Sequence, residues 1–255
     1  MIRRSVLALL TAIASTARAQ SVQPKPQDTE IWQPIPRVVT PGHTDADAPS
    51  DAVVLFDGTS LEEWVSAKDG SPAKWTASNG VMTVVKPAGD IRTKRSFANY
   101  QLHIEWRIPP NVTGKSQERG NSGVYLAWMP DGGYELQVLD SYDNPTYVNG
   151  QAGSVYKQFP PLVNAMRKPG EWQTYDVIWT APTFNADGSL KAPASVTALH
   201  NGVLVQNHVT LRGVTKNTGQ PDYKKAHGPL PILLQAHGDP SPSISFRNIW
   251  VRPLP

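Results

Sequence analysis

The chain has 255 residues, no cysteine and a formal net charge of +3. Without cysteine, the protein has no disulfides, no thiolate metal site and no cysteine nucleophile. The whole charge excess comes from Arg3, Arg4 and Arg18, so the rest of the chain is neutral and nucleic acid is not an expected partner.

Residues 1–19 have the pattern of a secretory signal peptide. Two arginines precede an apolar stretch over residues 6–13, and Ala17-Arg18-Ala19 forms a small-residue cleavage site. The apolar stretch is too short to span a bilayer and no later segment is apolar enough, so no membrane span is expected. We therefore expect the mature protein to be periplasmic or secreted.

Residues 20–51 are rich in Pro, Asp, Gln and Thr, with a few isolated apolar side chains. This composition predicts a Pro-rich extended arm or linker, partly disordered, that could dock through Trp32 and Ile35. The compact domain is expected over residues 52–255, with no internal repeat and no second boundary.

Within 52–255, nearly all local patterns are those of strands and turns. Residues 102–108, 172–179 and 244–251 show the alternation or β-rich composition of strands. Asn201-Gly202 between two apolar runs predicts a two-residue hairpin with a type I′ turn. Many short strands and eight Trp predict an all-β jelly-roll β-sandwich that follows the N-terminal extended arm.

The run over residues 134–140 places polar side chains on one face of an expected strand. Strand alternation puts Glu135 and Gln137 together, with aromatic and apolar side chains opposite them. Glu135 is then a candidate catalytic acid or base, and Gln137 an amide that orients a sugar hydroxyl. The alternative is that both face water from a convex sheet. Asp140, of opposite parity, either binds substrate from the rim or caps the next turn.

A second polar pair, Gln235 and His237, shares a face near the C-terminus. Imidazole titrates near neutrality, so His237 can pass a proton or bind a metal; the alternative is a buried structural histidine. With Gln235 beside it, we take His237 as the second catalytic candidate and Gln235 as a substrate-binding residue.

Residues 119–125 hold three further candidates for substrate binding. Arg119, Asn121 and Tyr125 could donate to sugar hydroxyls or to a developing enolate, and the last two share strand parity. No spacing of residues specifies a metal, so metal ligands are unknown. A divalent metal is possible, and no cofactor is assigned.

These motifs resemble the secreted 3-keto-disaccharide hydrolase family over residues 52–255. The resemblance implies a concanavalin A/laminin-G-like jelly roll and an activity on 3-keto-glycosides. Relatives commonly carry Leu-Gln-Asp-His-Gly where this chain has Ala236, and an Arg or Gln where Leu126-Ala127-Trp128 stands here. The matching segments are 55–61 with Trp64, 121–125, 134–140, 168–172, 199–202 and 246–250.

The implied reaction is removal of the hydrogen at C2 beside the 3-keto group, β-elimination of the C1 substituent and addition of water. It needs a base, an enolate stabiliser and an acid, for which Glu135 and His237 are the expected proton carriers. Direct hydrolysis by two carboxylates is less favoured, because Asp140 is the one acidic partner near Glu135 in sequence. The rival functions are a non-catalytic carbohydrate-binding module and an envelope interaction protein that uses the arm.

Overall fold

The computed structural model describes residues 23–255, so the expected signal peptide over residues 1–19 lies outside the described residues. Residues 23–38 form a unit of their own in which every side chain is exposed, including Trp32 and Ile35. Their one regular element is the 3-10 helix η1 (Pro26–Thr29).

The second unit begins at Val39 and runs to the C-terminus, so it starts before the expected boundary at residue 52. Residues 39–51 are held by the last strand, because Asn248 Nδ2 and Trp250 Nε1 both donate to the carbonyl of Ala46 at 2.9 Å. Arg252 Nε adds an ion pair with Asp51 at 2.9 Å.

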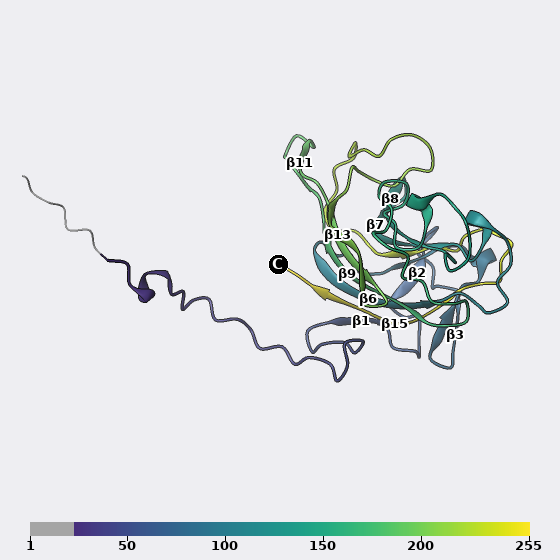
Figure 1. Ribbon diagram of the computed structural model, residues 1–255, viewed down its shortest axis with the longest axis horizontal. Helices are drawn as coiled ribbons and strands as arrows, with labels where there is room; N and C mark the ends of the chain where they lie inside the picture. The colour runs from purple at the N-terminus through teal and green to yellow at the C-terminus, as the bar shows by residue number, and fades with distance from the viewer. Residues whose placement is uncertain (1–22) are drawn as a thin grey trace, which may run out of the picture. The chain divides into compact units, whose positions relative to one another are not determined.

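Strands of the second unit form two antiparallel sheets that make up the layers of a sandwich (Figure 1). The large sheet has eight strands, ordered β13-β12-β9-β6-β15-β4-β3, with β1 also paired to β15. Its members are β1 (Val53–Phe56), β3 (Thr76–Ser78), β4 (Val81–Thr83), β6 (Tyr100–Arg107), β9 (Gln173–Thr180), β12 (Ser195–His200), β13 (Val203–Thr210) and β15 (Ser245–Pro253).

The small sheet has five strands in the order β2-β5-β14-β7-β8. A separate hairpin, β10 with β11, projects from the sandwich at the top of Figure 1. The remaining elements are β2 (Trp64–Ser66), β5 (Ile91–Thr93), β7 (Ser122–Met129), β8 (Gly132–Val138), β14 (Leu233–Leu234), β10 (Thr183–Phe184), β11 (Leu190–Ala192), η2 (Lys86–Ala88), η3 (Ser116–Glu118) and η4 (Val148–Gly150).

The core lies between the sheets, where apolar and aromatic side chains of both inner faces are buried. Tyr100 and Tyr175, from the large sheet, reach across it and donate to the carbonyls of Leu126 at 2.5 Å and Gln137 at 2.7 Å. A buried phenol needs such a partner, and these two bonds join the sheets at β7 and β8. They hold the strands that carry the site.

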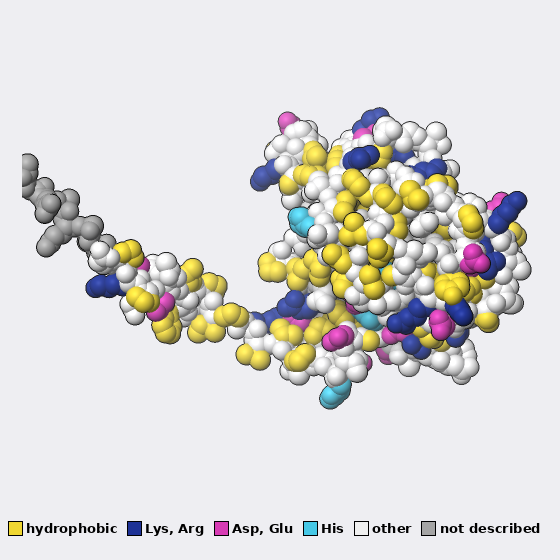
Figure 2. Space-filling view, in the orientation of Figure 1, with side chains coloured by type: hydrophobic (Ala, Val, Ile, Leu, Met, Phe, Trp, Pro, Cys, Tyr) yellow, Lys and Arg dark blue, Asp and Glu magenta, His cyan; other side chains and the backbone are white. Residues whose placement is uncertain are grey.

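The expected all-β jelly-roll sandwich is confirmed, and residues 23–255 contain no α-helix. Asn201 and Gly202 have φ of 53° and 78°, the left-handed values of the expected turn between β12 and β13. None of the helices in this range has the length and apolar character of a membrane span. On the face in Figure 2, positive and negative side chains are interspersed over the domain.

Candidate functional site

Strand register on the outer face of the small sheet brings the polar candidates together. Across β7 and β8, Tyr125 lies opposite Glu135 and Gly123 opposite Gln137. Beyond β14, the backbone N–H of Gln235 donates to the carbonyl of Gly123 at 3.0 Å, which extends the pairing by one residue. Because directly opposed residues point to the same face of a sheet, these side chains form one polar surface.

The expected strand around Gln235 and His237 is shorter than its alternation suggests. Regular pairing ends at Leu234, and the chain then turns so that Asp239 can contact both His237 and Lys86. His237 still reaches the polar surface, from a loop instead of a strand.

A cavity of about 270 Å³ lies over this surface. Its floor comes from β7, β8 and the segment after β14, and residues of two loops complete its wall. Of the eight site residues expected from the sequence, six line it. The lining consists of Asn121, Tyr125, Glu135, Gln137, Tyr156, Thr215, Asn217, Gln235 and His237.

Glu135 is a carboxylic acid held almost out of water, with 5 % of its surface exposed. Its backbone N–H donates to Thr215 Oγ1 at 3.1 Å, which ties the strand to the overlying loop. Burial and, to a smaller extent, the charge of Asp90 raise the pKa of Glu135 to about 8, although the hydrogen bond from Tyr125 opposes the shift. Near pH 7 this side chain is therefore mainly protonated and can donate a proton.

Gly123 makes room for that carboxyl group. A Cβ at this position would lie 2.5 Å from Glu135 Oε1 and 3.1 Å from its Cδ. The carboxyl group of Glu135 therefore packs directly against the backbone of β7. Any residue with a side chain at position 123 would displace Glu135.

Three amide side chains line up beside Glu135. Gln137 is 1 % exposed, and its amide lies 3.0 Å from Gln117 Oε1. In its other orientation the Gln137 nitrogen donates to Glu135 Oε1 at 3.2 Å and to the carbonyl of Ser122 at 3.1 Å. Asn121 Nδ2 donates to the carbonyl of Gln117 at 2.7 Å, so its position is also fixed. The group offers oriented N–H and C=O dipoles.

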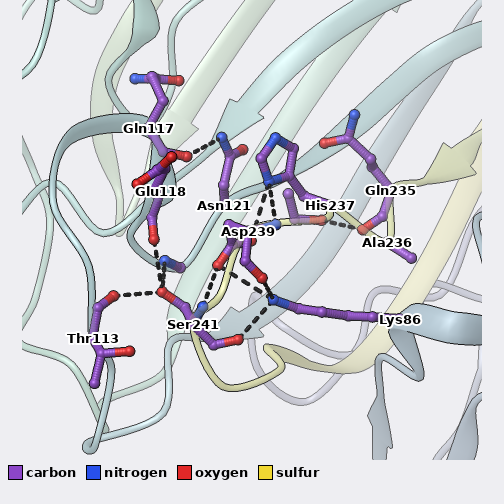
Figure 3. A network of polar contacts seen from close by, with 12 residues as sticks. Lys86, Thr113, Gln117, Glu118, Asn121, Gln235, Ala236, His237, Asp239 and Ser241 are labelled. Atoms are coloured by element: carbon purple, nitrogen blue, oxygen red, sulfur yellow. Dashed lines mark hydrogen bonds and ion pairs between the residues drawn. The ribbon is translucent and has the colours of Figure 1, made fainter.

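His237 is oriented by Asp239, as Figure 3 shows. The imidazole Nδ1 lies 3.1 Å from Asp239 Oδ2 and accepts a hydrogen bond from the Asp239 backbone N–H at 3.1 Å. Lys86 Nζ lies 3.3 Å from Asp239 Oδ1, and the backbone N–H of Ser241 donates to the same oxygen at 2.8 Å. Burial opposes ionisation of Asp239, but the contacts from His237, Ser241 and Lys86 outweigh it and lower the pKa of this carboxyl.

Asp90 is a carboxylate that sequence reasoning missed. It precedes β5 and accepts a hydrogen bond from the backbone N–H of Ala236 at 2.7 Å. Burial raises the pKa of Asp90, while the hydrogen bond from Ala236 and the charge of His237 oppose the rise. Asp90 therefore interacts electrostatically with both expected catalytic residues, and it supplies a carboxylate beside Ala236.

Arg119 and Asp140 do not line the cavity. Arg119 Nε lies 2.6 Å from Asp140 Oδ2, and the Asp140 side chain is 1 % exposed. Asp140 Oδ1 also accepts from the backbone N–H of Tyr142 at 3.2 Å, and its carbonyl accepts from Asn144 Nδ2 at 2.7 Å. These contacts are those of a residue that fixes the turn after β8, which was one of its two expected roles.

Local sequence carries a signal for only some of the residues that were missed. Asp239 has the parity of His237, two residues later, and could have been included on that ground. Tyr156, Thr215 and Asn217 come from loops without periodicity, so nothing in their sequence places them at the cavity. Within residues 23–255, no group of three or more His, Asp or Glu side chains is arranged to hold a metal ion.

Comparison with known proteins places these features in a family. A family model described as the 3-keto-alpha-glucoside-1,2-lyase-like domain matches residues 51–252. A solved structure from Parabacteroides distasonis, described as a "putative glycosyl hydrolase", is 56 % identical with a TM-score of 0.85, covering 90 % of this chain and 97 % of that one. A second structure with that description, from the same organism, is 19 % identical with a TM-score of 0.56, covers 80 % of this chain and 94 % of that one, and shows the shared fold alone.

No curated protein matches the chain. The family model, by contrast, spans the whole sandwich, including both strands of the polar surface and the His237 loop. The chain therefore belongs to the carbohydrate-active family of 3-keto-alpha-glucoside-1,2-lyase-like domains.

Proposed function

We propose that the protein cleaves the glycosidic bond of 3-keto-glycosides by proton abstraction at C2, elimination of the C1 substituent and addition of water. The observation that carries the proposal is one polar cavity that holds both a buried Glu135 with a pKa of about 8 and an imidazole oriented by a carboxylate. A protonated carboxyl group and an imidazole in one cavity can serve as the acid and the base of one reaction.

His237 is the base in this proposal. His237 Nδ1 accepts from the Asp239 backbone N–H in one tautomer and donates to Asp239 Oδ2 in the other, and this second tautomer leaves the Nε2 electron pair free for the hydrogen at C2. Asp239 stays ionised because its pKa is lowered, so it also stabilises the imidazolium that forms. In Figure 3 the ring edge away from Asp239 lies between Asn121 and Gln235.

Glu135 is the acid that protonates the leaving oxygen. Its raised pKa keeps the proton on the carboxyl group near neutral pH, and the Tyr125 phenol beside it is a donor because burial raises the pKa of that phenol as well. The amides of Asn121 and Gln137 supply oriented dipoles for the enolate oxygen at C3. Fixed donors of this kind stabilise developing charge without reorganisation.

Besides the substrate, water is the one reactant that the proton balance requires. His237 takes the C2 proton, and the electron pair of that bond forms an enolate with the C3 carbonyl. Collapse of the enolate forms the C1–C2 double bond and expels the C1 oxygen, which takes the Glu135 proton. Water then adds to C1 and returns a proton to Glu135, while the imidazolium returns its proton to C2.

The test is to incubate the purified protein with 3-keto-trehalose in D₂O and analyse the released 3-keto-glucose by mass spectrometry and NMR. Elimination and hydration predict deuterium at C2 of the product. Direct displacement at C1 leaves the C2 hydrogen in place, and binding without release of product would favour the carbohydrate-binding alternative.

Variants assign the two roles. Glu135→Gln and His237→Ala should each lower kcat by about 100-fold or more, since a positioned general acid or base contributes roughly 10²–10⁴. Glu62→Gln and His208→Ala change exposed side chains of the same types and should leave kcat unchanged. Wild-type turnover in both cavity variants would remove the assignment.

We also propose that the protein acts outside the cytoplasm. The support is the signal-peptide pattern of residues 1–19, with its cleavage site at Ala17-Arg18-Ala19. Expression in a Gram-negative host, fractionation and N-terminal sequencing should give periplasmic protein that starts at Gln20, whereas cytoplasmic protein that starts at Met1 would contradict export.

A further inference from the structure

The cavity over Glu135 is small for the class of substrate proposed above. Its volume of about 270 Å³ lies just below the ~300–1,000 Å³ that encloses a drug-sized ligand, so one sugar ring fits inside and a second ring does not. A disaccharide bound with its 3-keto ring over Glu135 must place its other ring at the mouth. The residues at that mouth therefore affect how well substrates with a second ring bind.

Two tyrosines contact one another at the cavity, and one of them lines it. Tyr156 lines the cavity, and its backbone N–H donates to the carbonyl of Glu135 at 3.1 Å. The Tyr156 hydroxyl lies 2.6 Å from that of Tyr147, and the two ring centroids are 6.3 Å apart. Tyr147 thus packs against a residue of the cavity wall without lining the cavity itself.

Tyr147 is held in place although it is exposed. A Cβ at Gly150 would lie 2.1 Å from Tyr147 Cε2 and 2.6 Å from Cδ2, so the ring rests on a backbone that only glycine can offer at this distance. With the hydroxyl bonded to Tyr156, both ends of the side chain are fixed. Even so, 40 % of its surface is open to solvent.

Lys157, the residue that follows Tyr156 in the chain, contacts both rings of the pair. Its Nζ lies 5.8 Å from the Tyr147 ring centroid and 5.6 Å from that of Tyr156. The ammonium donates to the carbonyl and Oδ1 of Asn217 at 2.6 and 2.7 Å, and Asn217 is itself a cavity residue. Lys157 therefore links the tyrosine pair to the second loop of the cavity wall.

We propose that Tyr147 and Tyr156 form a subsite that stacks on the second sugar ring of the substrate, which makes the enzyme selective for disaccharides or longer glycans over glycosides with a small aglycone. The proposal rests on the proposed function. An exposed aromatic ring that is fixed in advance loses little side-chain entropy on binding, and its apolar face suits the C–H face of a pyranose. Lys157 and Asn217 offer polar groups to the hydroxyls at the ring edge.

The experiment compares 3-keto-trehalose with methyl 3-keto-α-glucoside in steady-state kinetics of the full-length mature protein. Tyr147→Ala should raise KM for the disaccharide by about fivefold or more and leave KM for the methyl glycoside unchanged, because only the second ring loses its stacking partner. Tyr147→Phe keeps the ring and should retain most of the disaccharide affinity. Tyr142→Ala is the matched control, since this tyrosine is 46 % exposed and has Lys168 Nζ 5.9 Å from its ring but does not contact the cavity.

A binding measurement separates this proposal from the proposed function. Saturation-transfer NMR with trehalose and methyl α-glucoside needs no turnover, and wild-type protein should favour trehalose while Tyr147→Ala loses that preference. If this preference is found without cleavage of 3-keto-glycosides, the subsite stands and the proposed function fails. Two results would overturn the subsite. In one, Tyr147→Ala changes KM equally for the disaccharide and the methyl glycoside. In the other, Tyr142→Ala raises KM for the disaccharide as much as Tyr147→Ala does.

Discussion

The position of Gly123 allows the role of Glu135 to be tested through a residue that carries no chemistry of its own. In Gly123→Ala, the new Cβ would lie 2.5 Å from Glu135 Oε1, whereas ordinary contact begins at 3.4 Å. The φ of Gly123 is not in the left-handed region, so the backbone accepts alanine. The cost therefore falls on the Glu135 side chain, which is buried and cannot swing into water.

The carboxyl group has to retreat by roughly 1 Å, and a misplacement of that size can cost about 100-fold in rate. We expect kcat/KM for 3-keto-trehalose to fall by about that factor. Overpacking costs about 1–3 kcal/mol, which is less than the ~5–15 kcal/mol that separates folded from unfolded domains, so the variant should still fold. Thermal unfolding checks this expectation.

A second readout does not depend on turnover. Displacement of the carboxyl group changes its desolvation and its hydrogen bond with Tyr125, so the pKa of Glu135 should move away from about 8. NMR titration of protein labelled with ¹³C at the glutamate carboxyl measures it. Gly228→Ala is the matched control, because its Cβ meets no atom within 4 Å and its φ is not positive. Unchanged kcat/KM together with an unchanged Glu135 pKa would refute the reasoning.

Three further predictions concern carboxylates. The folded-state pKa of Glu135, about 8 against an ordinary 4.5, favours its protonated form, so the stability it contributes is full below pH 4.5 and is lost as pH rises towards 8. Glu135→Gln should therefore match wild type in urea unfolding at low pH and exceed it at pH 9, by up to about 5 kcal/mol. Asp90→Asn removes a negative charge near Glu135, so the Glu135 pKa should fall and the alkaline limb of the pH–rate profile, where the general acid loses its proton, should move to lower pH; an unchanged profile would exclude this coupling. Asp140→Ala leaves Arg119 without its buried partner and should cost about 3–5 kcal/mol in unfolding free energy, whereas a loss of substrate binding at full stability would instead make Asp140 a binding residue.

Much of the fold follows from patterns that are local in the sequence. Alternation over residues 102–108, 134–140 and 172–179 predicted strands that the structure contains as β6, β8 and β9. Asn201-Gly202 predicted its turn for an equally local reason, since both residues accept positive φ. Alternation also placed Glu135 and Gln137 on one face, because successive side chains of a strand point to opposite sides of the sheet.

Which faces meet across the molecule is not a local property. His237 lines the same cavity as Glu135 because β14 pairs with β7, far away in sequence, and the charge of Asp90 acts on both because β5 pairs with β14. Long-range pairing of this kind is selected by the burial of the two inner faces as a whole, which no single segment reveals. The same holds for Asp140, whose partner Arg119 is decided by packing around β7 and β8.

The acid–base properties of the site also came only with the tertiary structure. Glu135 is an ordinary carboxylic acid in the sequence, and its pKa of about 8 depends on burial beneath loop residues such as Thr215. The sequence by itself determined which groups exist and which face of a strand each one takes. Tertiary packing decided which of them lose water and which charges they meet, because desolvation and electrostatic interaction depend on distances through space and not along the chain.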